Sequence, residues 1–286
     1  MSARVFDARH CRLGEGALWH PLRRQLFWFD ILGRKLLTQE NGKPASWDFD
    51  EEVSAAGWID EHRLLIASAS GLWDFDIRDG SRRQLCPLEA GNSVTRSNDG
   101  RADPWGGFWI GTMGRNAEPG AGSIYRFFQG QLRRIVGDIT ISNAICFAPD
   151  RGHAFYTDTA TAKIMRIPLD RSGWPAGAPQ LWLDLSGEGL APDGAVADAD
   201  GTLWVAQWGA ARVAAYRDGA FQRAVDLPAD HITCPAFGGP DLTTLYATSA
   251  MQGIARSDLT DAHAHGQTFE ITGVAQGLPE PKVLLL

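Results

Sequence analysis

The sequence predicts an all-β fold, and three observations support this prediction. Glycine, tryptophan and phenylalanine are abundant, with 32, 11 and 13 copies in 286 residues. No long stretch repeats apolar residues every 3.6 positions, so a helical layer is not expected. Six short strands rich in aromatic and β-branched residues begin at positions 27, 64, 108, 154, 203 and 245, which are 37 to 49 residues apart. Repeats of this length are typical of propeller blades, and we expect a six-bladed β-propeller with four-stranded blades.

The fifth unit shows the expected blade most clearly. Pro192-Asp193-Gly194 forms a tight corner ahead of a short apolar strand, and an Asp-Gly turn at 200–201 leads into the strand at 203–206. A third strand is expected at 212–216 and a fourth at 221–225. Strands equivalent to 203–206 are expected at 27–30, 64–68, 108–112, 154–158 and 245–248.

The two ends of the chain are less regular. Residues 5–8 precede the first unit, and we expect them to add an outer strand to the last blade, which closes the ring and removes an open sheet edge. The sixth unit contains a polar insertion at 257–266 before an expected strand at 267–271. His263 and His265 in this insertion are expected to be solvated rather than bound to a metal. No interdomain linker is evident, so residues 1–286 are expected to form a single domain.

Composition excludes several classes of partner. The formal net charge is −7, without long blocks of one sign, which argues against a nucleic-acid surface and a polybasic membrane face. No apolar run is long enough to span a bilayer, and no signal peptide is evident, so a cytoplasmic location is expected. The four cysteines are far apart and form no CxxC pair, so we expect buried, reduced thiols at Cys11, Cys86, Cys146 and Cys234.

The candidate site follows from the propeller register. The six aromatic-rich strands that begin at positions 27, 64, 108, 154, 203 and 245 serve as landmark strands. The innermost strand of each blade lines the central channel, so the residues 10 to 12 positions before each landmark strand should stand at one mouth of the channel. Counting back gives Glu15, Ser54, Asn98, Asn143, Asp193 and the pair Thr233-Cys234. Asn and Asp also form turns, but four carboxylate or carboxamide side chains in one register favour a shared site.

Two carboxylates and one or two carboxamide oxygens form a hard-oxygen site. Such a set suits Ca²⁺, Mg²⁺ or Mn²⁺ better than Zn²⁺, although Zn²⁺ and Fe²⁺ stay open. Without a cation, two acids held this close would repel each other, and one would take up a proton. We therefore expect one divalent cation, with Ca²⁺ first.

Several motifs resemble the regucalcin (senescence marker protein)/gluconolactonase family. They are Leu-Gly-Glu-Gly at 13–16, Arg-Ser-Asn-Asp-Gly at 96–100, Gly-Thr-Met at 111–113, Gly-Ser-Ile-Tyr-Arg at 122–126, Ser-Asn at 142–143, Pro-Asp-Gly at 192–194, Leu-Trp-Val-Ala at 203–206 and Phe-Gly-Gly-Pro-Asp-Leu at 237–242. The resemblance implies a catalytic cation held by Glu15, Asn143 and Asp193, with Arg96 and Asn98 facing the substrate. The activity it implies is hydrolysis of a sugar lactone to the aldonic acid.

The chain departs from the family pattern in three segments. Ala17 follows Gly16 where proline is common, and Asn143-Ala144-Ile145 stands where Asn-Gly-Leu is common. The loop at 114–119, which shapes the substrate pocket in relatives, has its own sequence. None of these removes a proposed ligand, but pocket loops set substrate identity.

The lactonase hypothesis assigns each residue a role. Asp193 is the candidate general base, Glu15 and Asn143 hold the cation, and Arg96 and Asn98 bind ring hydroxyls of a small sugar lactone. One alternative is a phosphotriesterase or arylesterase, because a cation that polarises C=O also polarises P=O. A second alternative is a non-catalytic calcium-binding propeller.

The tryptophans are expected to divide into two groups. Those in strand patterns should pack between blades; they are Trp19, Trp28, Trp109 and Trp204. Trp208 and Trp174 follow a strand or lie in a loop, and each is a candidate for lining a pocket.

Overall fold

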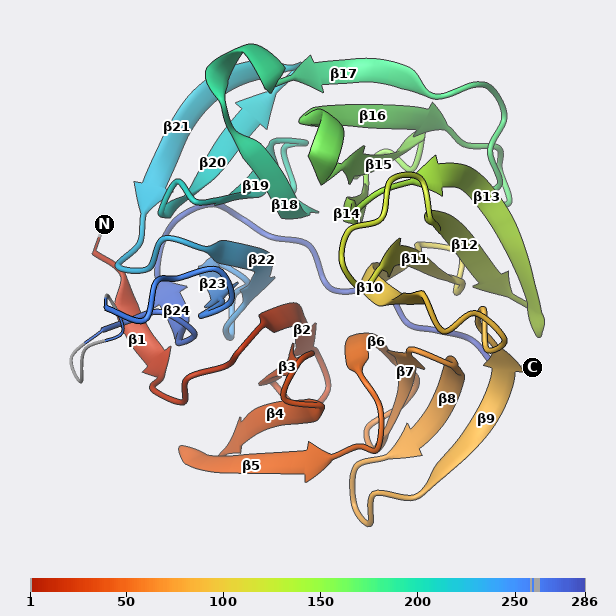
Figure 1. Cartoon of the computed structure of the whole chain (residues 1–286), viewed down its shortest axis with the longest axis horizontal. Coiled ribbons are helices and arrows are strands. Elements are labelled where there is room, and N and C mark those ends of the chain that lie inside the picture. The colour runs from red at the N-terminus through yellow and green to blue at the C-terminus, as the bar shows by residue number, and fades with distance from the viewer. Residues whose placement is uncertain (1, 258, 260–262, 286) are drawn as a thin grey trace.

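Six four-stranded antiparallel sheets stand around a central channel as the blades of a propeller, as Figure 1 shows for the computed structural model. The predicted fold class is confirmed. The structure describes residues 2–257, 259 and 263–285. In that part of the chain the helical elements are two three-residue 3-10 turns, η1 (Thr159–Thr161) and η2 (Ser186–Glu188), and no helix is long and apolar enough to cross a membrane.

In the first five blades the strands follow one another outward from the channel in chain order. The first blade contains β2 (Gly14–His20), β3 (Gln25–Asp30), β4 (Lys35–Glu40) and β5 (Lys43–Asp48). The second contains β6 (Val53–Trp58), β7 (Arg63–Ser68), β8 (Gly71–Asp76) and β9 (Arg82–Pro87). The third contains β10 (Thr95–Ala102), β11 (Phe108–Gly114), β12 (Gly122–Phe128) and β13 (Gln131–Ile139). The fourth contains β14 (Ser142–Phe147), β15 (His153–Asp158), β16 (Lys163–Pro168) and β17 (Gln180–Asp184). The fifth contains β18 (Ala191–Ala197), β19 (Leu203–Trp208), β20 (Arg212–Arg217) and β21 (Ala220–Asp226).

The sixth blade combines strands from both ends of the chain. It contains β22 (Ile232–Gly238), β23 (Thr244–Ser249), β24 (Thr268–Ile271) and, outermost, β1 (Arg4–Asp7). Arg4 pairs with Glu270, and Val5 pairs with Phe269. The prediction that an N-terminal strand closes the ring is therefore confirmed, with the strand starting one residue earlier than expected.

Burial decreases from the channel outward. Every residue of β2, β14 and β22 is buried, whereas the outer strand β5 consists of exposed and half-buried residues. The core lies between the faces of neighbouring blades, and the four tryptophans expected there are buried: Trp19, Trp28, Trp109 and Trp204. Large flat side chains fill the gap between two twisted sheets with few voids.

All six innermost strands carry an irregularity at the same position. Pairing with the second strand shifts between Glu15 and Leu18, Val53 and Ala55, Ser97 and Gly100, Asn143 and Cys146, Pro192 and Ala195, and Ile232 and Pro235. A β-bulge leaves a residue unpaired and re-aims its side chain. The bulges therefore lie where the register count expected functional side chains.

Two of these bulges contain a residue in the left-handed region. Gly16 has a φ of 58°, and Ala144 has a φ of 54°. Only glycine adopts this conformation without strain, which accounts for the glycine that is common at the position of Ala144 in the family that the motifs resemble.

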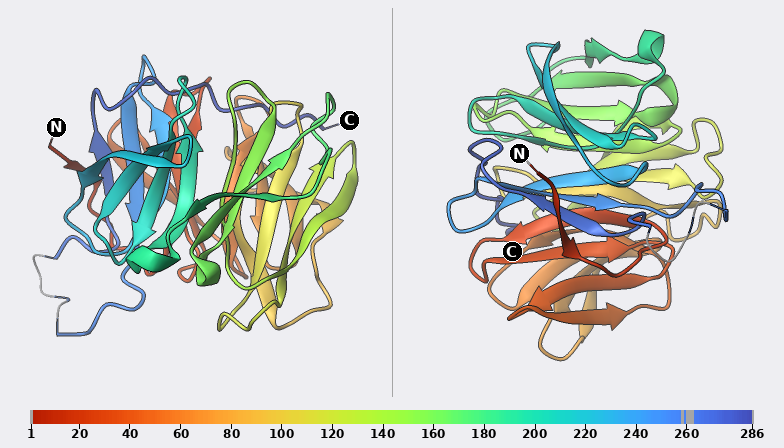
Figure 2. Two further views of the ribbon diagram at one scale, coloured as in Figure 1. Left: turned by 90° about the horizontal axis from the view of Figure 1, so that it is seen from above. Right: turned by 90° about the vertical axis from the view of Figure 1, so that its left-hand side faces the viewer.

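The C-terminal segment, residues 272–285, crosses one face of the ring. The Ala199 amide donates to the Gln276 carbonyl at 2.8 Å, and the amides of Val283 and Leu284 donate to the carbonyls of Trp58 and Gly106 at 2.9 Å each. Figure 2 (left) shows this segment along one edge of the ring, with the segment that follows β23 at the opposite edge. The C-terminal segment therefore lies at one mouth of the channel.

The four cysteines are free thiols. Cys11, Cys146 and Cys234 are buried as expected, and burial raises the pKa of each thiol. Cys86 is half-buried, which corrects the expectation that all four are buried, because it lies on the outer strand β9.

Candidate functional site

One cavity collects the side chains that the register count and the resemblance identified. Glu15, Arg96, Asn98, Asn143 and Asp193 all line a cavity of about 550 Å³ at the mouth of the channel opposite the C-terminal segment. They come from the inner strands of four blades, and each lies in or beside a bulge.

The other two counted positions do not line this cavity. The Ser54 hydroxyl donates to Ser97 Oγ at 2.8 Å, and the Thr233 hydroxyl donates to the Gly14 carbonyl at 2.5 Å. Both link neighbouring blades within the channel. Their side chains are short, so the bulge alone does not bring them to the mouth.

Hydrogen bonds fix which end of the Asn143 amide faces the cavity. Thr159 donates its hydroxyl proton to the Pro192 carbonyl at 2.7 Å, so Thr159 Oγ1 must accept from Asn143 Nδ2 at 2.9 Å. The amide nitrogen is thereby held toward Thr159, and Asn143 Oδ1 is left to face Asn98, whose Nδ2 donates to it at 3.0 Å. The carbonyl oxygen has two lone pairs, so one stays available for a cation.

Arg96 orients Asn98 in the same way. Arg96 Nη1 donates to Asn98 Oδ1 at 2.7 Å and to the Ser97 carbonyl at 2.8 Å. Asn98 Nδ2 then donates to the Ser142 carbonyl at 2.9 Å as well as to Asn143. The buried polar side chains form a connected chain across three blades, which keeps them in fixed positions.

The two carboxylates are buried without an ion pair. Glu15 is 3% exposed and Asp193 is 5% exposed, and neither forms a salt bridge within the described residues. Burial, together with the charge of Asp99, raises the pKa of Glu15 to about 8. Burial, together with the charge of Glu15, raises the pKa of Asp193 well above its ordinary value. Burial also lowers the pKa of Arg96 to about 10.

This donor set fits a hard divalent cation. Buried carboxylates are normally paired or bound to a metal, and Glu15 and Asp193 share a cavity with the amide oxygen of Asn143. No three His, Cys, Asp or Glu side chains in the described part of the chain are arranged to hold a metal. A cation here would therefore depend on Asn143 as its third protein ligand.

The rest of the cavity is lined by both polar and apolar side chains. Arg115 and Asn116, from the loop after β11, are among the polar ones. Trp208 lies at the end of β19, in the fifth blade, and stacks on His231 with ring centroids 4.1 Å apart and an interplanar angle of 13°. The apolar lining is completed by Leu13, Met113 and Ile141.

Sequence reasoning identified some of these residues and missed others. Trp208 was a pocket candidate and does line the cavity, whereas Trp174 lines a separate hollow on the outer face. Thr159 and Gln252 were missed. Thr159 could have been found because it directly follows the end of a landmark strand, at the same mouth as Asn143.

The comparison with known families identifies the chain. A family model described as "SMP-30/Gluconolactonase/LRE-like region" matches residues 13–251, which include every candidate site residue. The chain belongs to this family. Among SMP-30/gluconolactonase/LRE-like relatives, the 6-deoxy-6-sulfogluconolactonase of Pseudomonas putida is 34% identical over 274 residues, covering 94% of each chain. The L-arabinolactonase of Azospirillum brasilense is 33% identical over 263 residues, covering 89% of this chain and 86% of its own.

A solved structure in this family is also very similar. The calcium-binding protein regucalcin of Agrobacterium tumefaciens superposes with a TM-score of 0.97 at 38% identity, covering 99% of this chain and 98% of its own. The resemblance read from the motifs is thus confirmed at the level of family and fold.

Proposed function

We propose that this protein is a sugar lactonase that requires one divalent cation and hydrolyses an aldonolactone to the aldonic acid. The observation that carries the proposal is the shared cavity of Glu15, Asn143 and Asp193, beside Arg96 and Asn98. The names of the relatives, a sulfogluconolactonase and an L-arabinolactonase, support the same reaction class.

Glu15, Asn143 and Asp193 would hold the cation through oxygen atoms. Ca²⁺ is the first candidate because the donors are hard oxygens and a similar structure is that of a calcium-binding protein; Mn²⁺, Mg²⁺, Zn²⁺ and Fe²⁺ are the alternatives. When bound, the cation would polarise the lactone carbonyl and offset the charge that develops on its oxygen.

The chain's own residues account for the remaining steps. Asp193 takes a proton from the water that attacks the carbonyl carbon. The ring C–O bond then breaks, and the ring oxygen leaves with the electron pair and takes the proton held by Asp193, so it becomes a hydroxyl. The new carboxylic acid ionises and releases its proton to solvent. Arg96 stabilises the carboxylate that forms, and Asn98 holds a ring hydroxyl. Trp208 offers an apolar surface to the C–H face of the sugar ring.

The direct test is proton release from a panel of pentono- and hexonolactones. The protein is stripped with a chelator, reloaded with each cation in turn, and corrected for spontaneous lactone opening. Turnover restored by a cation on one or two lactones supports the proposal. Opening at the background rate with every cation would refute it, and a phosphotriester tested in parallel separates the esterase alternative.

The Asp193→Asn variant tests the assignment of the base. It keeps one oxygen ligand and the side-chain shape, so we expect most turnover to be lost while some cation affinity persists. Full turnover in this variant would remove Asp193 from the role of base.

A further inference from the structure

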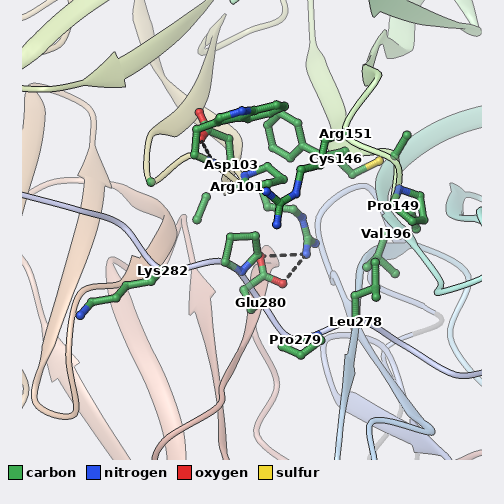
Figure 3. Close-up of a pocket in the computed structure, with 18 of the residues that line it drawn as sticks. Arg101, Asp103, Cys146, Pro149, Arg151, Val196, Leu278, Pro279, Glu280 and Lys282 are labelled. Carbon is green, nitrogen blue, oxygen red and sulfur yellow. Dashed lines mark hydrogen bonds and ion pairs between the residues drawn. The ribbon is translucent and has the colours of Figure 1, made fainter. Parts of the chain in front are cut away.

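A second cavity lies at the other mouth of the channel, between the C-terminal segment and blades three to five. Its volume is about 570 Å³. Figure 3 shows Arg101 from β10, Arg151 from the turn after β14, and Glu280 and Lys282 from the C-terminal segment around it. None of these residues lines the candidate active site.

The charges that line this cavity do not balance. Glu280 pairs with Arg101, whose Nη1 lies 2.8 Å from Glu280 Oε2. Asp103 pairs with the buried Arg126 at 2.7 Å and is therefore also neutralised. Arg151 and Lys282 remain; Lys282 points out of the cavity, as described below, so Arg151 is left as an uncompensated positive charge of the lining in a protein whose net charge is −7.

The two remaining cations have no acidic partner. No salt bridge of the described residues involves Arg151 or Lys282. Lys282 lies over the Trp58 ring at 5.7 Å from its centroid, and Arg151 is exposed at a turn. Figure 3 shows the Lys282 side chain pointing away from Arg101 and Arg151, so Arg151 is the cation available to an anion in the cavity.

Arg101 is occupied by its pairing with Glu280. It is 8% exposed, yet its Nε has no partner among the described residues. Its Nη2 makes only two long contacts, at 3.4 Å, to the carbonyls of Ala195 and Pro235. Because this Nε is itself buried, Arg101 does not reach a ligand through it, and its guanidinium stays paired with Glu280.

The walls of the cavity are apolar. Trp105 lines it from the third blade, and Phe147 lines it from the fourth. Leu278 and Leu284 line it from the C-terminal segment and are 39% and 51% exposed, among the most exposed large apolar side chains of the protein. A small inorganic anion would leave these surfaces in water, whereas a molecule with a hydrocarbon or aromatic body would cover them.

We propose that this rear cavity is a binding site for an amphipathic organic anion, a carboxylate or sulfonate with an apolar body. The anionic group lies beside Arg151, and the body packs on Phe147 and the exposed leucines. The site is separate from the active site and does not depend on the lactonase proposal.

The probe is 8-anilinonaphthalene-1-sulfonate, whose fluorescence rises in apolar surroundings. We expect saturable binding of one probe per native protein molecule, weakened by added salt because the contact is electrostatic. Naphthalene-2-carboxylate should displace the probe at lower concentration than the neutral 2-naphthol. Equal displacement by both compounds would overturn the anion assignment.

Arg151→Gly tests the location of the site. Arg151 has a φ of 62°, so glycine fits the backbone and the variant is expected to fold. Loss of one charge-assisted contact should weaken probe binding about tenfold. The matched control is Arg34→Gly, because Arg34 is also exposed, has a φ of 57° and lies outside this cavity.

Each result of these binding experiments either supports or overturns the proposal. Weaker binding in Arg151→Gly alone, with the thermal midpoint unchanged, supports the proposal. No binding to the wild-type protein, or equal binding by the two variants, overturns it. Displacement of the probe by a saturating sugar acid in the presence of Ca²⁺ would assign the probe to the cavity of the candidate active site and overturn the proposal as well.

Discussion

Gly16 is the position at which the geometry of the bulges can be tested most directly. Its φ is 58°, and a Cβ built there would lie 2.2 Å from the Ser54 carbonyl oxygen of the neighbouring blade and 2.8 Å from a ring carbon of Phe29. The Gly16 amide also donates to Glu15 Oε2 at 2.8 Å. The change Gly16→Ala should therefore strain the backbone, separate two blades and displace a candidate ligand.

The expected loss of stability is about 3 kcal/mol, within a range of about 1 to 5 kcal/mol. The left-handed conformation costs alanine about 1 to 2 kcal/mol. Overpacking against a backbone carbonyl adds about 1 to 3 kcal/mol. The reduced entropy of the unfolded chain offsets about 0.4 to 1 kcal/mol. For a protein of this size each kcal/mol lowers the midpoint by about 2 to 4 °C, so we expect a fall of roughly 5 to 15 °C.

The assay is thermal and urea unfolding followed by circular dichroism, with Gly201→Ala as control. Gly201 has a φ of 81° and no heavy atom within 4 Å of an added Cβ, so this variant carries only the backbone term, about 1 kcal/mol. If Gly16→Ala costs no more than Gly201→Ala, the inferred close approach of the first two blades is wrong.

Three further predictions concern the site itself. Thr159→Val removes the acceptor that orients the Asn143 amide, so Ca²⁺ affinity measured by calorimetry should fall about tenfold, and unchanged affinity would refute the orienting role. Trp208→Ala should raise KM for the best lactone about tenfold with a smaller change in kcat. Trp208→Phe should recover most of the loss. A change confined to kcat would contradict the inference that Trp208 only binds the substrate. Burial raises the pKa of the Asp99 carboxyl to about 6, compared with about 3.9 in the unfolded chain. The folded protein therefore binds this proton more tightly, so the stability that the protonated carboxyl contributes is present below pH 4 and is lost as the pH rises through 6. In metal-free protein, Asp99→Asn should raise the midpoint at pH 7.5 and leave it unchanged near pH 4, and an equal effect at both pH values would contradict the shift.

The propeller was predictable because its information is local and repeated. Each blade has its own turn and aromatic strand. Because the unit occurs six times, equivalent positions can be aligned between the repeats. The same repetition predicted that Glu15, Asn98, Asn143 and Asp193 lie at one mouth of the channel. The prediction works because a bulge occurs at the same point of each of their inner strands. Counting back from the second strand therefore finds the residues that a bulge turns toward the mouth.

The remaining features depend on contacts between distant segments. The residues after 272 have no strand pattern, and their course is set by backbone bonds to Trp58 and Gly106. The orientation of Asn143 depends on Thr159, which in turn depends on a carbonyl of the next blade. No spacing of residues in the sequence indicates these hydrogen bonds between distant segments. The same holds for the rear cavity, whose charged residues come from three separate stretches of chain.

The pairing of β1 with β24 also constrains how the protein is made. Arg4 and its partner Glu270 are 266 residues apart, so at about 5 to 20 residues per second roughly 13 to 53 s pass on the ribosome between their synthesis. During that interval five blades can form, but the ring stays open with two unprotected faces and a free N-terminal strand. Such a nascent chain is exposed to pairing with its neighbours on a polysome. We expect the yield of native protein to depend on chaperones during synthesis far more than on the stability of the finished ring.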